Sequence, residues 1–358
     1  MSNTNDETTV QMVVGAIAYD PQRGLVFSGT AGAQPSAIPA TAPISMSLNY
    51  DDRSVPAAAT FSWLDAAAEK NAGNSFEIVL PLPEHSDQPL CSVTCDLPDW
   101  LTLDPAVATF LAEIFPRDDK AYEAMFLRKI HRFGDEALQY FMARQLSQSF
   151  SGKRAYRVGA AVVMTYKALE INDPALQEEA LRHVKTQLVR VDECEITNHP
   201  RTNREHLEIS LLCAKWHLEL ALRRHDEFFA TLEHCRSRAA GITNFFTPAY
   251  NLSMTLLMLC ALLARKGDVE QAAVVANEGM QIFKNAVAST TQQLTLFQEL
   301  RISHRNVHLM LCATKPDKQT DADFKIYFRN SLRVLGEAVD RLTDAALAIY
   351  PVQEVNRS

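Results

Sequence analysis

The first hundred residues contain very little positive charge. They hold three basic residues, Arg23, Arg53 and Lys70, against twelve aspartates and glutamates. The rest of the 358-residue chain is almost neutral, and the formal net charge is −8. Nucleic-acid phosphates favour basic faces, so this balance argues against general nucleic-acid binding.

The chain also lacks the short motifs of common enzyme chemistries. It has no G-x-x-x-x-G-K-[ST] or G-x-G-x-x-G phosphate loop, no G-x-S-x-G elbow and no H-E-x-x-H motif. Acidic pairs such as Glu178/Glu179 are adjacent in sequence, so their side chains diverge on a helix, whereas acid–base catalysis needs converging carboxylates. We therefore expect neither catalysis nor a cofactor, and keep an enzyme or small-ligand-binding protein with a dispersed site as the alternative.

Cysteines are few and odd in number. Of the seven, five fall in helical patterns: Cys194, Cys213, Cys235, Cys260 and Cys312. This distribution suits reduced, buried thiols better than a disulfide framework.

The opening residues MSNTNDETTVQ have no cationic segment followed by an apolar run, so no secretory signal is predicted and a cytoplasmic protein is expected.

One long stretch lacks charge altogether. Residues 245–264, FFTPAYNLSMTLLMLCALLA, have nearly the length that spans a bilayer. Pro248 and Asn251 interrupt its start, however, and helices that are apolar all round also occur in large cores. We expect a buried central helix and no membrane span.

Prolines and glycines crowd into the first hundred residues, which hold nine of the sixteen prolines. Two apolar, β-branched runs flank Asp20–Gly24, a pattern typical of a β-hairpin. Further strands are predicted at 75–80 and 90–95. Residues 28–47 are uncharged and rich in Ala, Pro and Ser, which favours an exposed connection. Residues 1–100 are thus predicted to form an acidic β-rich module.

From residue 101 the chain shows the starts and stops of helices. Asp104-Pro105 and Asp173-Pro174 each place a capping carboxylate before a proline at the first helical position. Gly267 is a typical helix stop. The predicted fold class is therefore α+β, predominantly α, with antiparallel helical hairpins over 101–358.

The clearest hairpin lies at residues 253–284. Its first helix carries Leu256, Leu259, Cys260 and Leu263, its turn is Gly267-Asp268, and its second helix carries Ala272, Ala276 and Gly279. The small residues of the second helix would let the two helices approach closely. This unit resembles a tetratricopeptide repeat, although Cys260 and Leu263 depart from that family's preferences.

The resemblance implies a solenoid that binds a protein or peptide partner and serves as a scaffold, adaptor or regulator. A weaker copy of the turn is predicted at His225-Asp226, followed by Ala230. The other spacings are irregular, so a helical bundle of unrelated topology is the alternative fold.

The sharpest candidate surface is basic. The side chains of Arg301, His304, Arg305 and His308 fall at i, i+3, i+4 and i+7 of a predicted helix and share one face. Two guanidinium groups beside two imidazoles suit a phosphate or the acidic side chains of a partner. The alternative is a solvated face, or one paired with carboxylates of the acidic N-terminal module.

Two sets of metal-competent residues are weaker candidates. His206, Cys213 and His217 share one helical face but converge poorly on a single ion. Cys91 and Cys95, with His85 upstream, do not have the spacing of a zinc knuckle. No metal site is predicted from either set.

Overall fold

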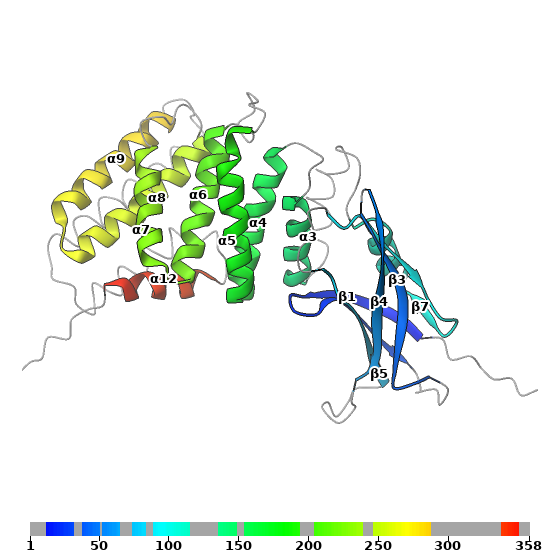
Figure 1. Ribbon diagram of the computed structural model, residues 1–358. Coiled ribbons are helices and arrows are strands. Elements are labelled where there is room, and N and C mark those ends of the chain that lie inside the picture. Colours follow the sequence, from blue (N-terminus) through cyan, green and yellow to red (C-terminus); the bar gives the residue numbers. More distant parts are fainter. Residues whose placement is uncertain are drawn as a thin grey trace, which may run out of the picture. The chain divides into compact units, whose positions relative to one another are not determined.

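The computed structural model describes residues 12–31, 38–50, 52–64, 74–83, 89–114, 135–148, 154–193, 204–238, 246–287 and 338–350. The protein is α+β, with an N-terminal curled β-sheet followed by helices (Figure 1). It divides into two compact units, Met1–Gly152 and Lys153–Ser358. The first unit therefore extends past the change of composition near residue 100.

Seven strands of the first unit form one sheet. They are β1 (Met12–Asp20), β2 (Gly24–Ala31), β3 (Thr41–Asn49), β4 (Ser54–Trp63), β5 (Asn74–Leu80), β6 (Ser92–Asp96) and β7 (Leu101–Leu103). Their order is β6-β3-β4-β5-β2-β1-β7. Neighbours are antiparallel except for β1 and β7, which are parallel.

The predicted hairpin at Asp20–Gly24 is confirmed. Asp20 pairs with Gly24 at the end of the β1–β2 ladder. The Asp20 carboxylate accepts hydrogen bonds from the backbone N–H groups of Gln22 (2.8 Å) and Arg23 (3.1 Å). Gly24 has φ +97°, a conformation that side chains disfavour. The turn is thus determined by its own residues.

The exposed connection predicted at 28–47 is wrong over most of its length. Residues 28–31 belong to β2 and residues 41–47 to β3. In β3 the side chains of Ile44, Met46 and Leu48 alternate into the core, each at most 5% exposed. Pro43 is tolerated because β6 pairs with β3 only over Ser45–Asn49, which leaves the proline on an unpaired side.

One helix contacts both edges of this sheet. Helix α1 (Pro105–Ala112) packs on the edge strands β6 and β7 and on β1. The backbone N–H of Ile114, just after α1, donates to the carbonyl of Cys91, just before β6 (2.9 Å). The Asp104 carboxylate caps α1 through the N–H of Ala106 (2.8 Å), as predicted. The sheet therefore curls until its two edges meet one helix.

Helix α3 (Glu136–Gln148) completes the first unit and contacts β1. The rings of Tyr19 and Phe141 lie 4.9 Å apart. The Gln145 side-chain oxygen accepts from the N–H of Leu90 at 2.8 Å. These contacts explain why the unit extends beyond residue 100.

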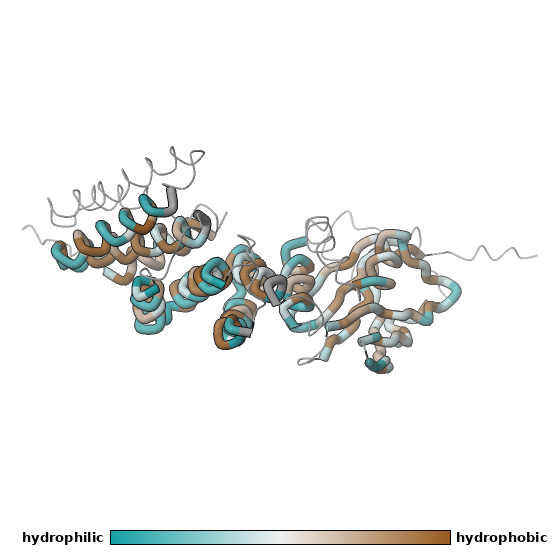
Figure 2. Tube along the Cα trace, turned by 90° about the horizontal axis from the view of Figure 1, so that it is seen from above, coloured by the Kyte–Doolittle hydropathy of each residue, from teal (hydrophilic) through white to brown (hydrophobic). Residues whose placement is uncertain are grey.

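The described residues of the second unit form three helical hairpins and one further helix. The hairpins are α4 (Arg154–Ile171) with α5 (Pro174–Val189), α6 (Arg204–Ala221) with α7 (His225–Ser237), and α8 (Phe246–Lys266) with α9 (Val269–Val287); the further helix is α12 (Ala338–Ile349). Hydrophobic and hydrophilic residues alternate along the helices (Figure 2). The first helices stack in order, α4 on α6 and α6 on α8.

Each hairpin turns through one residue in the left-handed conformation. These residues are Asn172 (φ 61°), Arg223 (φ 57°) and Gly267 (φ 94°). The predicted turn at Gly267-Asp268 is confirmed, and the Asp268 carboxylate accepts from the N–H of Gln271 at 3.3 Å. The predicted turn at His225-Asp226 is two residues too late, because Arg223 takes the left-handed position and His225 begins α7.

The apolar run predicted to be a buried helix forms most of α8. Over Pro248–Lys266 this helix has the length and composition to cross a membrane, yet 78% of its most apolar 18-residue window is buried inside the protein. It packs against α6, α7 and α9. Such burial is typical of a core helix.

Candidate functional site

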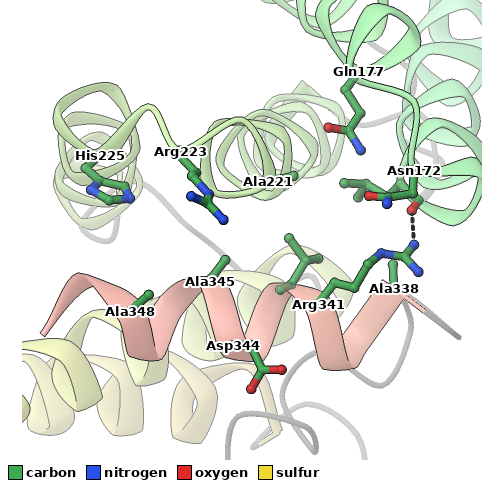
Figure 3. A pocket seen from close by; sticks show the side chains of 12 residues that line it. Asn172, Gln177, Ala221, Arg223, His225, Ala338, Arg341, Asp344, Ala345 and Ala348 are labelled. Carbon is green, nitrogen blue, oxygen red and sulfur yellow. Dashed lines mark hydrogen bonds between the residues drawn. The ribbon is translucent and has the colours of Figure 1, made fainter. Parts of the chain in front are cut away.

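A pocket of about 590 Å³ lies where α12 crosses the ends of the first two hairpins (Figure 3). Three groups of residues line it. The α4–α5 region contributes Leu169, Asn172 and Gln177, the α6–α7 region Ala221, Arg223 and His225, and α12 contributes Ala338, Arg341, Leu342, Asp344, Ala345 and Ala348. Its polar walls thus come from inter-helix turns, and its floor from one face of α12.

Hydrogen bonds from arginine side chains to backbone carbonyls hold α12 in place, one arginine lying on α12 and one on α8. The Arg341 guanidinium donates through Nη2 to the carbonyls of Leu169 (2.5 Å) and Glu170 (3.2 Å) at the C-terminal end of α4. Arg265 of α8 donates from Nε to the carbonyl of Tyr350, just beyond α12 (2.7 Å). Cations at helix C-termini satisfy unpaired carbonyls and oppose the helix dipole. The side chains of Leu342 and Leu347, which belong to α12, are buried.

The polar groups of the pocket are arranged asymmetrically. Gln177 is only 4% exposed, and its side-chain amide points into the pocket while donating to the carbonyl of Ala168 at 3.5 Å (Figure 3). Arg223 also points into the space above α12. Asp344 points away from it, on the far side of the helix. The pocket interior is therefore dominated by donors and positive charge.

Ion pairs join the second helices of successive hairpins. Arg224, at the start of α7, binds both carboxylate oxygens of Glu178 in α5 (2.7 and 2.8 Å). Lys185 of α5 binds Glu227 of α7 at 2.7 Å and lowers the pKa of that carboxyl. Farther along, Arg236 of α7 binds Glu278 of α9 through two contacts (2.7 and 2.9 Å). We call these pairs the ion-pair ladder.

Two of the predicted metal-competent residues lie in a packed interior instead of an open site. Cys213 and His217 are buried on α6, and the Cys213 sulfur lies 3.5 Å from the Thr255 hydroxyl of α8. Burial raises the pKa of Cys213 to about 11 and lowers that of His217 to about 3. Both groups are therefore neutral at pH 7. Among the described residues, no group of three His, Cys, Asp or Glu side chains is placed to hold a metal ion.

The other sequence candidates divide between the described and undescribed parts of the chain. Cys91 is buried before β6 and Cys95 is half-buried within it. Burial raises the pKa of Cys95 to about 11. His85 and the basic stripe of Arg301, His304, Arg305 and His308 lie outside the described residues.

The pocket itself was missed by sequence reasoning. Arg341 reaches the end of α4 from about 170 positions away, and no local pattern joins those two segments. The three groups of lining residues have separate sequence signals. Two of them lie at helix turns and the third lies on an amphipathic helix. The packing of α12 onto α6 and the contact of Arg341 with the end of α4 bring them together.

Comparison with known proteins gives no assignment, because no protein-family model matches the chain and no curated protein matches its sequence.

Proposed function

We propose that the chain is a protein-binding scaffold, adaptor or regulator that uses a helical-repeat surface. The observation that carries the proposal is the ordered stacking of α4, α6 and α8, each the first helix of a hairpin. Stacked hairpins form extended surfaces that grip peptides or folded partners. In this proposal the array is a tetratricopeptide-like solenoid, and the partner is a protein or peptide.

The ion-pair ladder supports this role. It joins α5 to α7 and α7 to α9, so each hairpin is tied to the next through its second helix as well as its first. Partly exposed pairs contribute little stability one by one. Repeated at successive interfaces, however, they set the register between hairpins. A fixed register is what a binding surface assembled from several repeats requires.

A second function, small-ligand binding, is supported by the pocket beneath the hairpin turns. Its volume of about 590 Å³ falls in the range of small-molecule sites, roughly 300–1,000 Å³. Its lining combines apolar side chains with a few polar ones. Groups with pKa values shifted by burial, such as His217 and Cys213, do not line it. This composition favours binding over catalysis.

The scaffold proposal is tested by affinity purification of the full-length chain from its native cells, with chemical crosslinking before lysis. We expect one partner in a fixed stoichiometric ratio. The Arg301→Glu/Arg305→Glu double variant should lose that partner while its far-UV circular dichroism is unchanged. Arg182→Glu, at an exposed site on α5, is the control and should retain it.

Two results would contradict this proposal. Recovery of no stoichiometric partner under crosslinking would argue against a scaffold. Equal recovery of the partner by the wild type and the double variant would show that the basic stripe is not the partner-facing surface.

A further inference from the structure

We propose that the pocket between α12 and the hairpin turns binds a small organic anion, an amphiphile with a carboxylate head and a short apolar body. The inference rests on the second of the two functions above, and it does not require a protein partner. Four features of the pocket support it: its cations, its buried amide, its apolar floor and its size.

Two guanidinium groups line the pocket, that of Arg223 at the α6–α7 turn and that of Arg341 beside the end of α4 (Figure 3). Arg223, in the α6–α7 turn, is exposed, points into the pocket, and takes part in no ion pair within the described part of the chain. Arg341 approaches from α12, and its described hydrogen bonds both use Nη2. Its Nε and Nη1 groups are thus left for a ligand. Guanidinium groups recognise carboxylates through paired, charge-assisted hydrogen bonds.

The sign of the ligand charge follows from the surrounding groups. Asp344 is the acidic residue of the lining, and it points away from the space that Arg223 and Gln177 face (Figure 3). His225, in the α6–α7 region like Arg223, adds a further nitrogen donor or acceptor to the lining. A cationic ligand would meet two guanidinium groups and is disfavoured by charge repulsion.

The remaining lining fits an apolar body of modest length. Six small or aliphatic side chains line it: Leu169, Ala221, Ala338, Leu342, Ala345 and Ala348. The alanines leave room where larger residues would fill the space between α12 and the turns. The Gln177 amide is buried and aimed into this space, so a bound polar atom would meet a fixed partner. An amphiphile satisfies both halves of the lining, which a simple inorganic anion does not.

Such a ligand would join elements that are otherwise tied by few polar contacts. It would contact α12 through Arg341 and the α6–α7 turn through Arg223. Because it binds only when α12 is docked, it stabilises the docked helix by mass action. Binding of the anion would therefore hold α12 more firmly against the hairpins.

The test is isothermal titration calorimetry of the full-length protein with sodium octanoate. Three further probes separate the contributions of head and tail: 1-octanol lacks the charge, acetate lacks the tail, and octyl phosphate carries a different anionic head. We expect octanoate to bind, and octanol and acetate to bind at least about tenfold more weakly, as the loss of charge-assisted hydrogen bonds or apolar contact requires.

Two variants locate the site. Arg223→Asn removes the cation, and asparagine tolerates the left-handed backbone at that turn; octanoate affinity should fall about tenfold. Ala345→Phe fills the pocket and should abolish binding. Arg182→Asn, on an exposed part of α5, is the matched control and should leave the affinity unchanged.

The proposal is overturned if octanoate does not bind, if octanol binds as tightly, or if both pocket variants bind like the wild type. Tighter binding of octyl phosphate than of octanoate would overturn the carboxylate head and identify phosphate as the preferred one. Crosslinking of the wild-type protein separates the two functions. A wild-type protein that recovers its partner but does not bind octanoate leaves the scaffold proposal intact and ends this inference.

Discussion

The hydroxyl of Ser253 in α8 donates a hydrogen bond to the backbone carbonyl of Gly279 in α9 (3.0 Å). A side chain as short as serine reaches the facing backbone only where two helices lie unusually close. Ala272 and Ala276, on the same helix as Gly279, are 0% and 7% exposed. The close approach predicted from small residues in the α8–α9 hairpin is thus a property of the folded protein.

Removing this contact should destabilise the α8–α9 hairpin. We expect Ser253→Ala to lower the free energy of unfolding by about 1 kcal/mol, since one buried hydrogen bond is lost. Ser253→Leu should cost about 1–3 kcal/mol, because the longer side chain has no room between the helices. Urea unfolding followed by circular dichroism would measure both. A leucine variant as stable as the wild type would show that the helices are not closely packed.

Gly29 and Gly159 should respond in opposite directions to the same substitution. A Cβ at Gly29 in β2 would collide with the backbone carbonyl of Val13 and with the ring of Phe76, whereas a Cβ at Gly159 in α4 would meet no atom within 4 Å. Gly29→Ala should therefore cost about 2–3 kcal/mol.

Gly159→Ala should instead stabilise the protein by about 0.5–1 kcal/mol, because alanine favours the helix and restricts the unfolded chain. Thermal unfolding of the two variants side by side gives the comparison. A Gly29→Ala variant that melts with the wild type would contradict the close strand packing.

Buried His217 should make stability fall in acid. Its pKa is lowered to about 3 by burial, against about 6.5 in the unfolded chain. Between these values the unfolded state binds the additional proton, so stability is complete above about pH 6.5 and falls by roughly 1.4 kcal/mol for each pH unit below it. His217→Phe should remove about 2 kcal/mol of the stability lost between pH 7 and pH 5.

The measurement is urea unfolding at the two pH values. His234→Gln, at an exposed site on α7, is the control and should retain the wild-type pH dependence. An unchanged acid response in His217→Phe would show that another group determines it.

Arg341 should control how firmly α12 is docked. Arg341→Gln removes the charged contact with the carbonyls that end α4, and should lower the free energy of α12 opening by about 1 kcal/mol. Hydrogen exchange should then accelerate about fivefold over residues 338–350 and remain unchanged in α5. Arg341→Lys should restore part of the protection. Uniform acceleration throughout the second unit would indicate global destabilisation instead.

Local signals in the sequence are enough to predict part of this fold. Asp104-Pro105 and Asp173-Pro174 each contain the cap and the first helical residue, so α1 and α5 begin where the sequence predicts. The same holds for the turn at Asp20–Gly24. In each case the deciding contacts lie within three residues.

Other features depend on partners distant in sequence. The composition of residues 28–47 hides the alternation of Ile44, Met46 and Leu48, and only pairing with β4 and β6 makes that segment a strand. Arg223 is an unusual residue for a left-handed turn, so the sequence pointed to the His-Asp pair beside it. The pocket depends on Arg341 meeting the end of α4, which no local pattern encodes.

Helix α1 contacts both β6 and β7, the two edge strands of the sheet. Strand edges present unpaired N–H and C=O groups that recruit further strands. Because one helix contacts both edges, its detachment would expose two complementary ends of the sheet at once. A molecule with two open ends adds copies in a line, whereas one with a single open end stops at a pair. Partial unfolding around Pro105–Ala112 would therefore favour linear polymers over dimers.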